Sequence, residues 1–170
     1  MIKKMIRSGF FLILVSVSAC GYQFSSAGKL VGNVTEVNVA MFENESAETG
    51  AETIFSNAFI GELVRRSGAD VVDKKRAEAF ITARITSINI GALTRTSDDE
   101  VLERRVTAVV DLKMVTRQGE VLFSVKGFSE DDEYSVSHSS VSDDFSRRAA
   151  IEKIAVSFAE KMVSRLKDDF

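Results

Sequence analysis

The sequence has a single cysteine, Cys20, and its position in the chain limits which reactions its thiol can undergo. A lone cysteine cannot form an intramolecular disulfide, and an unpaired thiol is a liability in an oxidising compartment. Cys20 directly follows a short apolar stretch that ends in two small residues, Ser18 and Ala19. We therefore expect Cys20 to be consumed by a covalent attachment rather than by a disulfide.

The residues before Cys20 have the three-part pattern of a secretory signal. Lys3, Lys4 and Arg7 give a basic start without acids, and residues 10–17 are almost entirely apolar. Small residues then precede the predicted cut. A membrane-spanning helix needs about 20 apolar residues, so this stretch is too short to be a permanent anchor. Residues 1–19 are predicted to be a signal peptide.

The four residues Val17-Ser18-Ala19-Cys20 resemble the lipobox of bacterial lipoproteins, with valine where leucine is commonest. This resemblance implies that Cys20 becomes the mature N-terminus and carries diacylglycerol and an N-acyl chain such as palmitate. Several acyl chains anchor a protein durably, because each buried methylene contributes about 0.8 kcal/mol. By resemblance to lipoprotein sorting, Gly21 leaves the outer membrane as the expected location. The alternative is an ordinary secretory signal with a leftover thiol.

Catalytic and metal-binding patterns are scarce. His138, the only histidine, lies among serines, but a catalytic triad also needs an orienting acid and oxyanion donors. One histidine and a modified cysteine cannot supply the usual zinc ligands, and no phosphate-binding glycine loop occurs. We therefore predict a protein that is not an enzyme, with no catalytic residue, no metal and no cofactor beyond the lipid on Cys20.

Two acidic clusters, Asp98–Glu100 and Glu130–Glu133, lack the ligand spacing and central glycine of a calcium loop. They are interpreted as solvated loop charge. A paired-carboxylate hydrolase stays open as a minor alternative, because such pairs are invisible in sequence.

Arginines are the remaining candidates for binding. Arg95, Arg104, Arg105 and Arg117 fall near the ends of predicted strands, and guanidinium groups bind phosphates in bidentate fashion. They could grip an anionic lipid headgroup, or they could be edge charges that discourage sheet pairing. The formal net charge of −3 includes three signal cations, so the mature chain is near −3 − 3 = −6. That charge argues against a nucleic-acid-binding protein.

The elements that must position these residues follow from periodicity. Val37–Met41 and residues 79–85 alternate as strands, and a phase change near Ser87 predicts a bulge. A helix is expected from Ala51 to Gly68, started by a capping box at Thr49–Glu52. A brief strand at Val71-Val72 is possible.

The second half of the chain predicts a hairpin and a helix. Val106–Met114 and Val121–Val125 alternate around a tight turn at Arg117–Gly119. Residues 94–100 are expected to be a loop, and residues 130–144 a loop or frayed strand end. An amphipathic helix is expected from Asp143 to Lys167.

These elements predict an α+β fold: a two-layer α/β sandwich with two helices packed on one face of a mostly antiparallel sheet of about four strands. The predicted organisation is a signal peptide (1–19), a lipidated N-terminus and tether (20–32), and a single α+β domain (33–170).

The start Cys20-Gly21-Tyr22-Gln23-Phe24 resembles the Cys-Gly-aromatic-x-hydrophobic start of the lipopolysaccharide-assembly lipoproteins (LptE). The order of elements is similar to that family over the whole mature chain, including the first helix ending at Arg65–Gly68, the segment Ala77–Ala83 and the last helix at Arg148–Leu166.

This resemblance implies two helices on a mixed four-stranded sheet, and a non-enzymatic protein that plugs an outer-membrane β-barrel partner (LptD-like). It implies a role in lipopolysaccharide transport, with basic residues contacting the glycolipid. The loop before the last helix, residues 135–144, has no lysine or arginine. The contact candidates are therefore Arg95, Arg104, Arg105 and Arg117. The alternatives are a lipoprotein module of another envelope secretion or assembly complex, and an envelope hydrolase.

Overall fold

The computed structural model describes residues 29–95, 101–137 and 139–167. The predictions made for the signal peptide, Cys20, the Asp98–Glu100 cluster and His138 lie outside these described residues.

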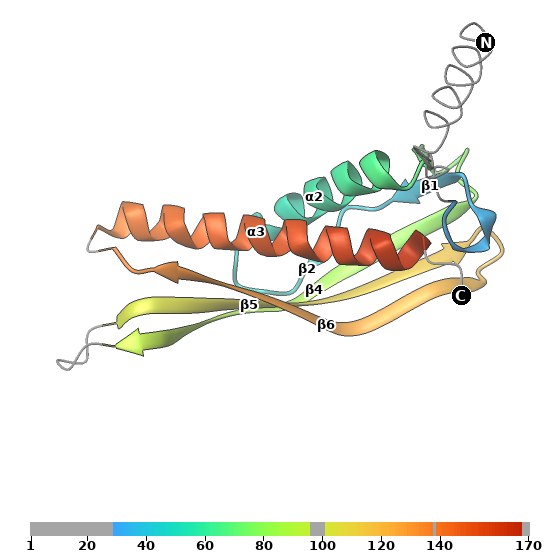
Figure 1. The fold of residues 1–170 in the computed structure, drawn as a ribbon. Coiled ribbons are helices and arrows are strands. Elements are labelled where there is room, and N and C mark those ends of the chain that lie inside the picture. Colours follow the sequence, from blue (N-terminus) through green and yellow to red (C-terminus); the bar gives the residue numbers. More distant parts are fainter. Residues whose placement is uncertain (1–28, 96–100, 138, 168–170) are drawn as a thin grey trace, which may run out of the picture.

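Two helices cover one face of a long, twisted sheet, as Figure 1 shows. The helices are α2 (Ala51–Arg66) and α3 (Ser140–Lys167). The other elements, in chain order, are the 3₁₀ turn η2 (Val31–Asn33) and the strands β1 (Glu36–Val39), β2 (Glu43–Asn44), β3 (Asp70–Val71), β4 (Ala79–Arg95), β5 (Val101–Thr116) and β6 (Val121–Ser135). The predicted α+β class and the placement of both helices on one face are confirmed.

The sheet differs from the prediction of about four mostly antiparallel strands. It has six strands in the order β3-β1-β4-β5-β6, with β2 also paired to β4. β1 runs parallel to β3 and β4, and β2 parallel to β4, whereas β4-β5-β6 is antiparallel. The parallel pairs arise because α2 carries the chain across one face of the sheet between β1 and β3, and a crossover joins parallel strands. Two-residue strands such as β2 are too short to leave a periodic signal.

The predicted core positions of β5 are confirmed, whereas Val121 at the start of β6 is 50% exposed. Val106, Ala108, Val110, Leu112 and Met114 are all buried beneath the helices. The predicted bulge is also present. Ile85 lies opposite Val110 and Ser87 opposite Val109, so Thr86 is the extra residue. The extra residue explains why the apolar phase changes there.

The predicted capping box of α2 is wrong. Gly50 precedes the helix with a φ of 86°, and no side chain caps it. The Glu52 carboxylate instead accepts a hydrogen bond from Asn44 Nδ2 at 2.9 Å, which links the first turn of α2 to the end of β2. Gly50 adopts a left-handed conformation that glycine tolerates without strain, and the Ala51 N–H donates to the Glu48 carbonyl oxygen at 3.3 Å.

The segment 130–144, expected to be a loop or frayed strand end, is largely regular structure. β6 continues to Ser135, and α3 begins at Ser140 rather than Asp143. The chain's serines and acids are poor strand formers, so packing against α3 overrides local propensity here. At the other end, Leu30 lies within the segment predicted as a tether, yet it is 1% exposed and packs in the core.

Glu78 connects the start of β4 to β1. Its carboxylate accepts hydrogen bonds from the backbone N–H groups of Thr35 at 2.9 Å and Glu36 at 3.4 Å. These bonds favour the ionised form and lower the pKa of Glu78 below its ordinary value of 4.5. A carboxylate with a lowered folded-state pKa stabilises the fold above its unfolded pKa, and this contribution is lost as the pH falls through the folded value.

We therefore expect the variant Glu78→Gln to melt at a lower temperature than the wild type near neutral pH. The difference should narrow as the pH falls below 4.5, because the wild-type carboxylate then becomes neutral as well. Thermal unfolding followed by circular dichroism over a pH series measures this. Glu120→Gln is the matched control, since the Glu120 carboxylate makes no hydrogen bond or ion pair with the described residues. A difference that stays constant with pH would contradict the prediction.

Candidate functional site

The four arginines singled out from sequence do not form one cluster. Arg104 lies on the helix-covered face of β5, in register with the buried Val106, whereas Arg105 lies on the open face. Arg117 follows β5 at the opposite end of the sheet from Arg95, which ends β4. The structure therefore brings together only Arg95 and Arg104.

Arg95 and Arg104 line a recess of about 430 Å³ where the sheet meets the start of α3. Arg147 of α3 adds a third guanidinium. Apolar side chains form part of the wall, and Asp143 and Asp144 contribute carboxylates. The recess therefore combines three cations with two acids, and it can hold an anionic group only beside those acids.

Arg104 is held in place from two sides. Its Nη1 lies 3.2 Å from Asp143 Oδ2 and 3.5 Å from the Tyr134 hydroxyl oxygen, to which it donates. The hydrogen bond to Tyr134 and the charge of Asp143 raise the pKa of Arg104. Its side chain is still 38% exposed, so the guanidinium has donors open to the recess. Asp143 orients it while accepting a hydrogen bond from the Ser137 N–H at 3.4 Å.

Arg147 was not among the residues selected from sequence. Its Nη1 lies 2.7 Å from Glu48 Oε1, and its Nη2 lies 3.1 Å from Asp144 Oδ1. Glu48 belongs to the loop before α2, so Arg147 ties the two helices' starts together. The i,i+3 spacing of Asp144 and Arg147 was visible in the sequence, but the approach to Arg104 depends on tertiary packing.

Arg105 and Arg117 have other partners. On the open face, Arg105 Nη2 lies 2.6 Å from Glu133 Oε1, and its Nε lies 3.5 Å from Asp131. The Arg117 guanidinium donates to the carbonyl oxygens of Lys75 at 2.8 Å and Ala77 at 2.6 Å. Arg117 thereby braces the turn before β4, which is a structural role.

The acidic cluster Glu130–Glu133, expected to be solvated loop charge, lies on a strand and is paired. Glu130 accepts from Ser157 at 3.1 Å and pairs with Lys161, and Lys153 Nζ lies 3.2 Å from Asp132. The alternation of a strand sends these two acids toward α3 and sends Asp131 and Glu133 toward Arg105. Over the described part of the chain, no group of three or more His, Cys, Asp or Glu side chains could hold a metal ion.

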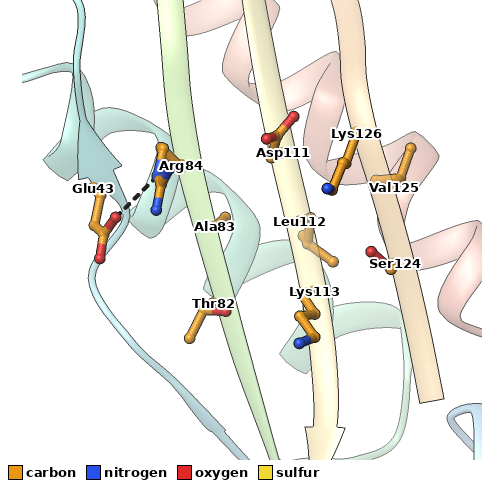
Figure 2. A pocket seen from close by; sticks show the side chains of 10 residues that line it. All are labelled: Glu43, Thr82, Ala83, Arg84, Asp111, Leu112, Lys113, Ser124, Val125 and Lys126. Carbon is orange, nitrogen blue, oxygen red and sulfur yellow. Dashed lines mark hydrogen bonds and ion pairs between the residues drawn. The ribbon is translucent and has the colours of Figure 1, made fainter. Parts of the chain in front are cut away.

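A second depression, of about 390 Å³, lies on the sheet and is drawn in Figure 2. Arg84, Lys113 and Lys126 surround it together with Glu43 and Asp111. Glu43 pairs with Arg84 at 3.1 Å, and Asp111 accepts the Gly127 N–H at 2.7 Å. Both carboxylates are therefore engaged, which weakens the hydrolase alternative at this place.

The model of the family described as "LptE: Lipopolysaccharide-assembly" matches residues 34–166. No curated protein matches the chain. Within the described residues, no helix has both the length and the apolar character needed to cross a membrane.

Solved structures share the fold at low identity. A lipoprotein B from Nitrosomonas europaea is 13% identical with a TM-score of 0.58, covering 79% of this chain and 83% of that one. The rare lipoprotein B from Shewanella oneidensis is 12% identical with a TM-score of 0.51, covering 73% and 91%. A PelC dodecamer from Paraburkholderia phytofirmans is 16% identical with a TM-score of 0.51, covering 84% and 96%.

The family match spans both helices and all six strands of the described fold. The chain therefore belongs to the LptE lipopolysaccharide-assembly family.

Proposed function

We propose that this protein is an outer-membrane lipoprotein of the lipopolysaccharide transport and assembly machinery. In this role it partners and plugs an LptD-like β-barrel and performs no catalysis. The observation that carries the proposal is the family match across residues 34–166. The two-layer fold, with one sheet face left open for a partner, is compatible with it.

The proposed anchor is the lipid on Cys20. Cleavage after residue 19 would leave diacylglycerol and an N-acyl chain on the cysteine, with residues 20–32 as tether and 33–170 as the domain. The protein would then sit on the periplasmic side of the outer membrane or inside the partner barrel. Mass spectrometry of the N-terminal peptide tests this step, and an unmodified thiol on the mature protein would contradict it.

The proposed glycolipid contact is the recess lined by Arg95, Arg104 and Arg147. Lipopolysaccharide carries phosphates, and guanidinium groups match phosphate oxygens in bidentate fashion. The apolar wall formed partly by Ile90 and Val101 suits a ligand that has both charge and hydrocarbon.

Co-purification is the direct test of the proposed function. The lipidated full chain, tagged at its C-terminus, is extracted from outer membranes in detergent and captured. We expect one large β-barrel protein to be recovered in a fixed ratio to the chain. Recovery without any such barrel would overturn the proposal.

The alternative is a lipoprotein module of another envelope secretion or assembly complex. The same fold occurs in the PelC dodecamer, a twelve-copy assembly, and this likeness is the reason to retain the alternative. Reproducible capture of a partner that is not a large barrel would favour this alternative.

A further inference from the structure

The first turns of α3 extend beyond the start of α2. Arg147 pairs at 2.7 Å with Glu48, which lies just before α2, and Glu160 pairs at 3.2 Å with Arg66 at the end of α2. α2 therefore runs alongside α3 only from Arg147 onward. Among the described residues, no second helix lies beside residues 140–146, and Figure 1 shows this start of α3 projecting past α2. We call residues 140–146 the α3 overhang.

The α3 overhang carries two large apolar side chains that are mostly exposed. Val141 is 77% exposed and Phe145 is 76% exposed. They lie 18 residues before Ala159 and Val163, respectively, which is about five helical turns, so all four residues share one stripe of α3. Ala159 and Val163 are 1% and 0% exposed in the core where the two helices pack. The same stripe is therefore buried beside α2 and bare on the overhang.

Exposed apolar side chains gather around the recess lined by Arg95, Arg104 and Arg147, which we call the arginine recess. Within the described residues, eight large apolar side chains are exposed, and four of them lie within two residues of a recess-lining residue: Leu93, Leu102, Val141 and Phe145. Leu102 follows the alternation of Arg104 on the helix-covered face of β5. The arginine recess is therefore bordered by hydrocarbon on the strand side and on the helix side.

We propose that this apolar border holds acyl chains of the lipid whose phosphate is bound in the arginine recess. The inference rests on the proposed glycolipid contact and extends it from the headgroup to the hydrocarbon. Guanidinium groups match phosphate oxygens, and burial of Val141, Phe145 and Leu102 under acyl chains removes apolar surface from water. The occupant is therefore a phosphorylated lipid such as lipid A, which anchors lipopolysaccharide in the membrane.

The layout of the surface favours a lipid over an apolar segment of a protein. The exposed side chains lie on α3 and on β5, on two sides of a cationic recess, and flexible acyl chains can follow both sides from one headgroup. A phosphate also presents several oxygens, so it can be shared by guanidiniums that already hold a carboxylate, as Arg104 holds Asp143. The contact leaves the open face of the sheet available to the barrel partner.

Titration of two ligands against the full lipidated chain tests the proposal. Intact lipid A carries phosphates and acyl chains, whereas its phosphorylated disaccharide headgroup carries the phosphates alone. The double variant Val141→Ala with Phe145→Ala removes the apolar surface of the α3 overhang. Val156→Ala is the matched control, because Val156 is 49% exposed on the same helix and does not line the arginine recess.

We expect the wild type to bind intact lipid A more tightly than the headgroup. The double variant should bind intact lipid A about tenfold more weakly than the wild type, since burial of a large apolar side chain contributes enough for a factor of this size. Its affinity for the headgroup should match that of the wild type, and Val156→Ala should match the wild type for both ligands.

Unchanged affinity of the double variant for intact lipid A would overturn the proposal. So would an equal loss for both ligands, an equal loss in Val156→Ala, or a wild type that does not distinguish the two ligands. Loss of the barrel from co-purification with the double variant, at unchanged lipid affinity, would assign the α3 overhang to a protein partner instead. The titration uses the isolated chain, so its failure is distinguishable from a failure of barrel capture, which tests the proposed function.

Discussion

Replacing Phe158 by alanine is expected to lower the free energy of unfolding by about 3–5 kcal/mol, the cost typical of truncating a buried phenylalanine. Phe158 is 1% exposed and lies where α3 meets α2 and the sheet. Its ring centroid lies 5.9 Å from that of Phe55, 6.1 Å from Phe42 and 5.8 Å from Phe128. The truncation therefore removes contacts with both layers and leaves a cavity between them.

Chemical denaturation of the full chain in detergent, followed by circular dichroism, measures this change. Phe145→Ala is the matched control, because Phe145 is on the same helix but 76% exposed. It should change the unfolding free energy by no more than about 0.5 kcal/mol, as surface substitutions usually do. Similar losses in both variants would contradict the central role of Phe158 in the core.

The core around Phe158 could be predicted largely from sequence. The helical face of Ile151, Ile154, Ala155, Phe158 and Met162 repeats at the helix period, and all five residues are buried. Long periodic segments are the strongest signals that a sequence carries. The hairpin turn was also predictable, because Arg117–Gly119 is a tight-turn signal between two alternating segments. In the structure, Gly119 adopts a φ of 90° where β5 turns into β6.

The secondary-structure predictions that were wrong concern segments whose structure depends on contacts between residues distant in sequence. β2 is two residues long and exists because Asn44 pairs with Ile85 of β4. Glu130 and Asp132 extend β6 because α3 supplies Lys161 and Lys153 as counter-charges. Neither arrangement leaves a local pattern, so a reading by propensity assigns loops.

The site was predictable only by residue type. Arg104 and Arg105 are neighbours in sequence, and strand alternation alone should have placed them on opposite faces. Arg147 could not be selected, because its place beside Arg104 is set by how α3 packs across the end of the sheet. Of the four arginines selected from sequence, Arg95 and Arg104 line one recess, whereas Arg105 and Arg117 are bound to other residues.

The double variant Arg95→Ala with Arg104→Ala is expected to weaken lipopolysaccharide binding by about tenfold to a hundredfold. Hydrogen bonds to charged groups contribute about 1.5–3 kcal/mol each, and 1.4 kcal/mol corresponds to a factor of ten. The partly exposed position of Arg104 favours the lower end of this range, because solvent screens its charge. Binding to the purified chain is measured by titration at two salt concentrations, and the wild-type affinity should fall at the higher one.

The control for this variant is Arg105→Ala, which removes a neighbouring cation from the opposite face of β5. Arg105 is held by Glu133 and Asp131, so its loss should leave glycolipid affinity unchanged. A comparison of these two variants separates a located phosphate contact from a general effect of net charge, because both remove a cation from β5 but from opposite faces; the double variant also removes Arg95 at the end of β4. Unchanged affinity in a folded Arg95→Ala, Arg104→Ala protein would remove the recess as the glycolipid site. Weaker binding in Arg105→Ala alone would move that site to the open face, where Arg84, Lys113 and Lys126 surround the other depression.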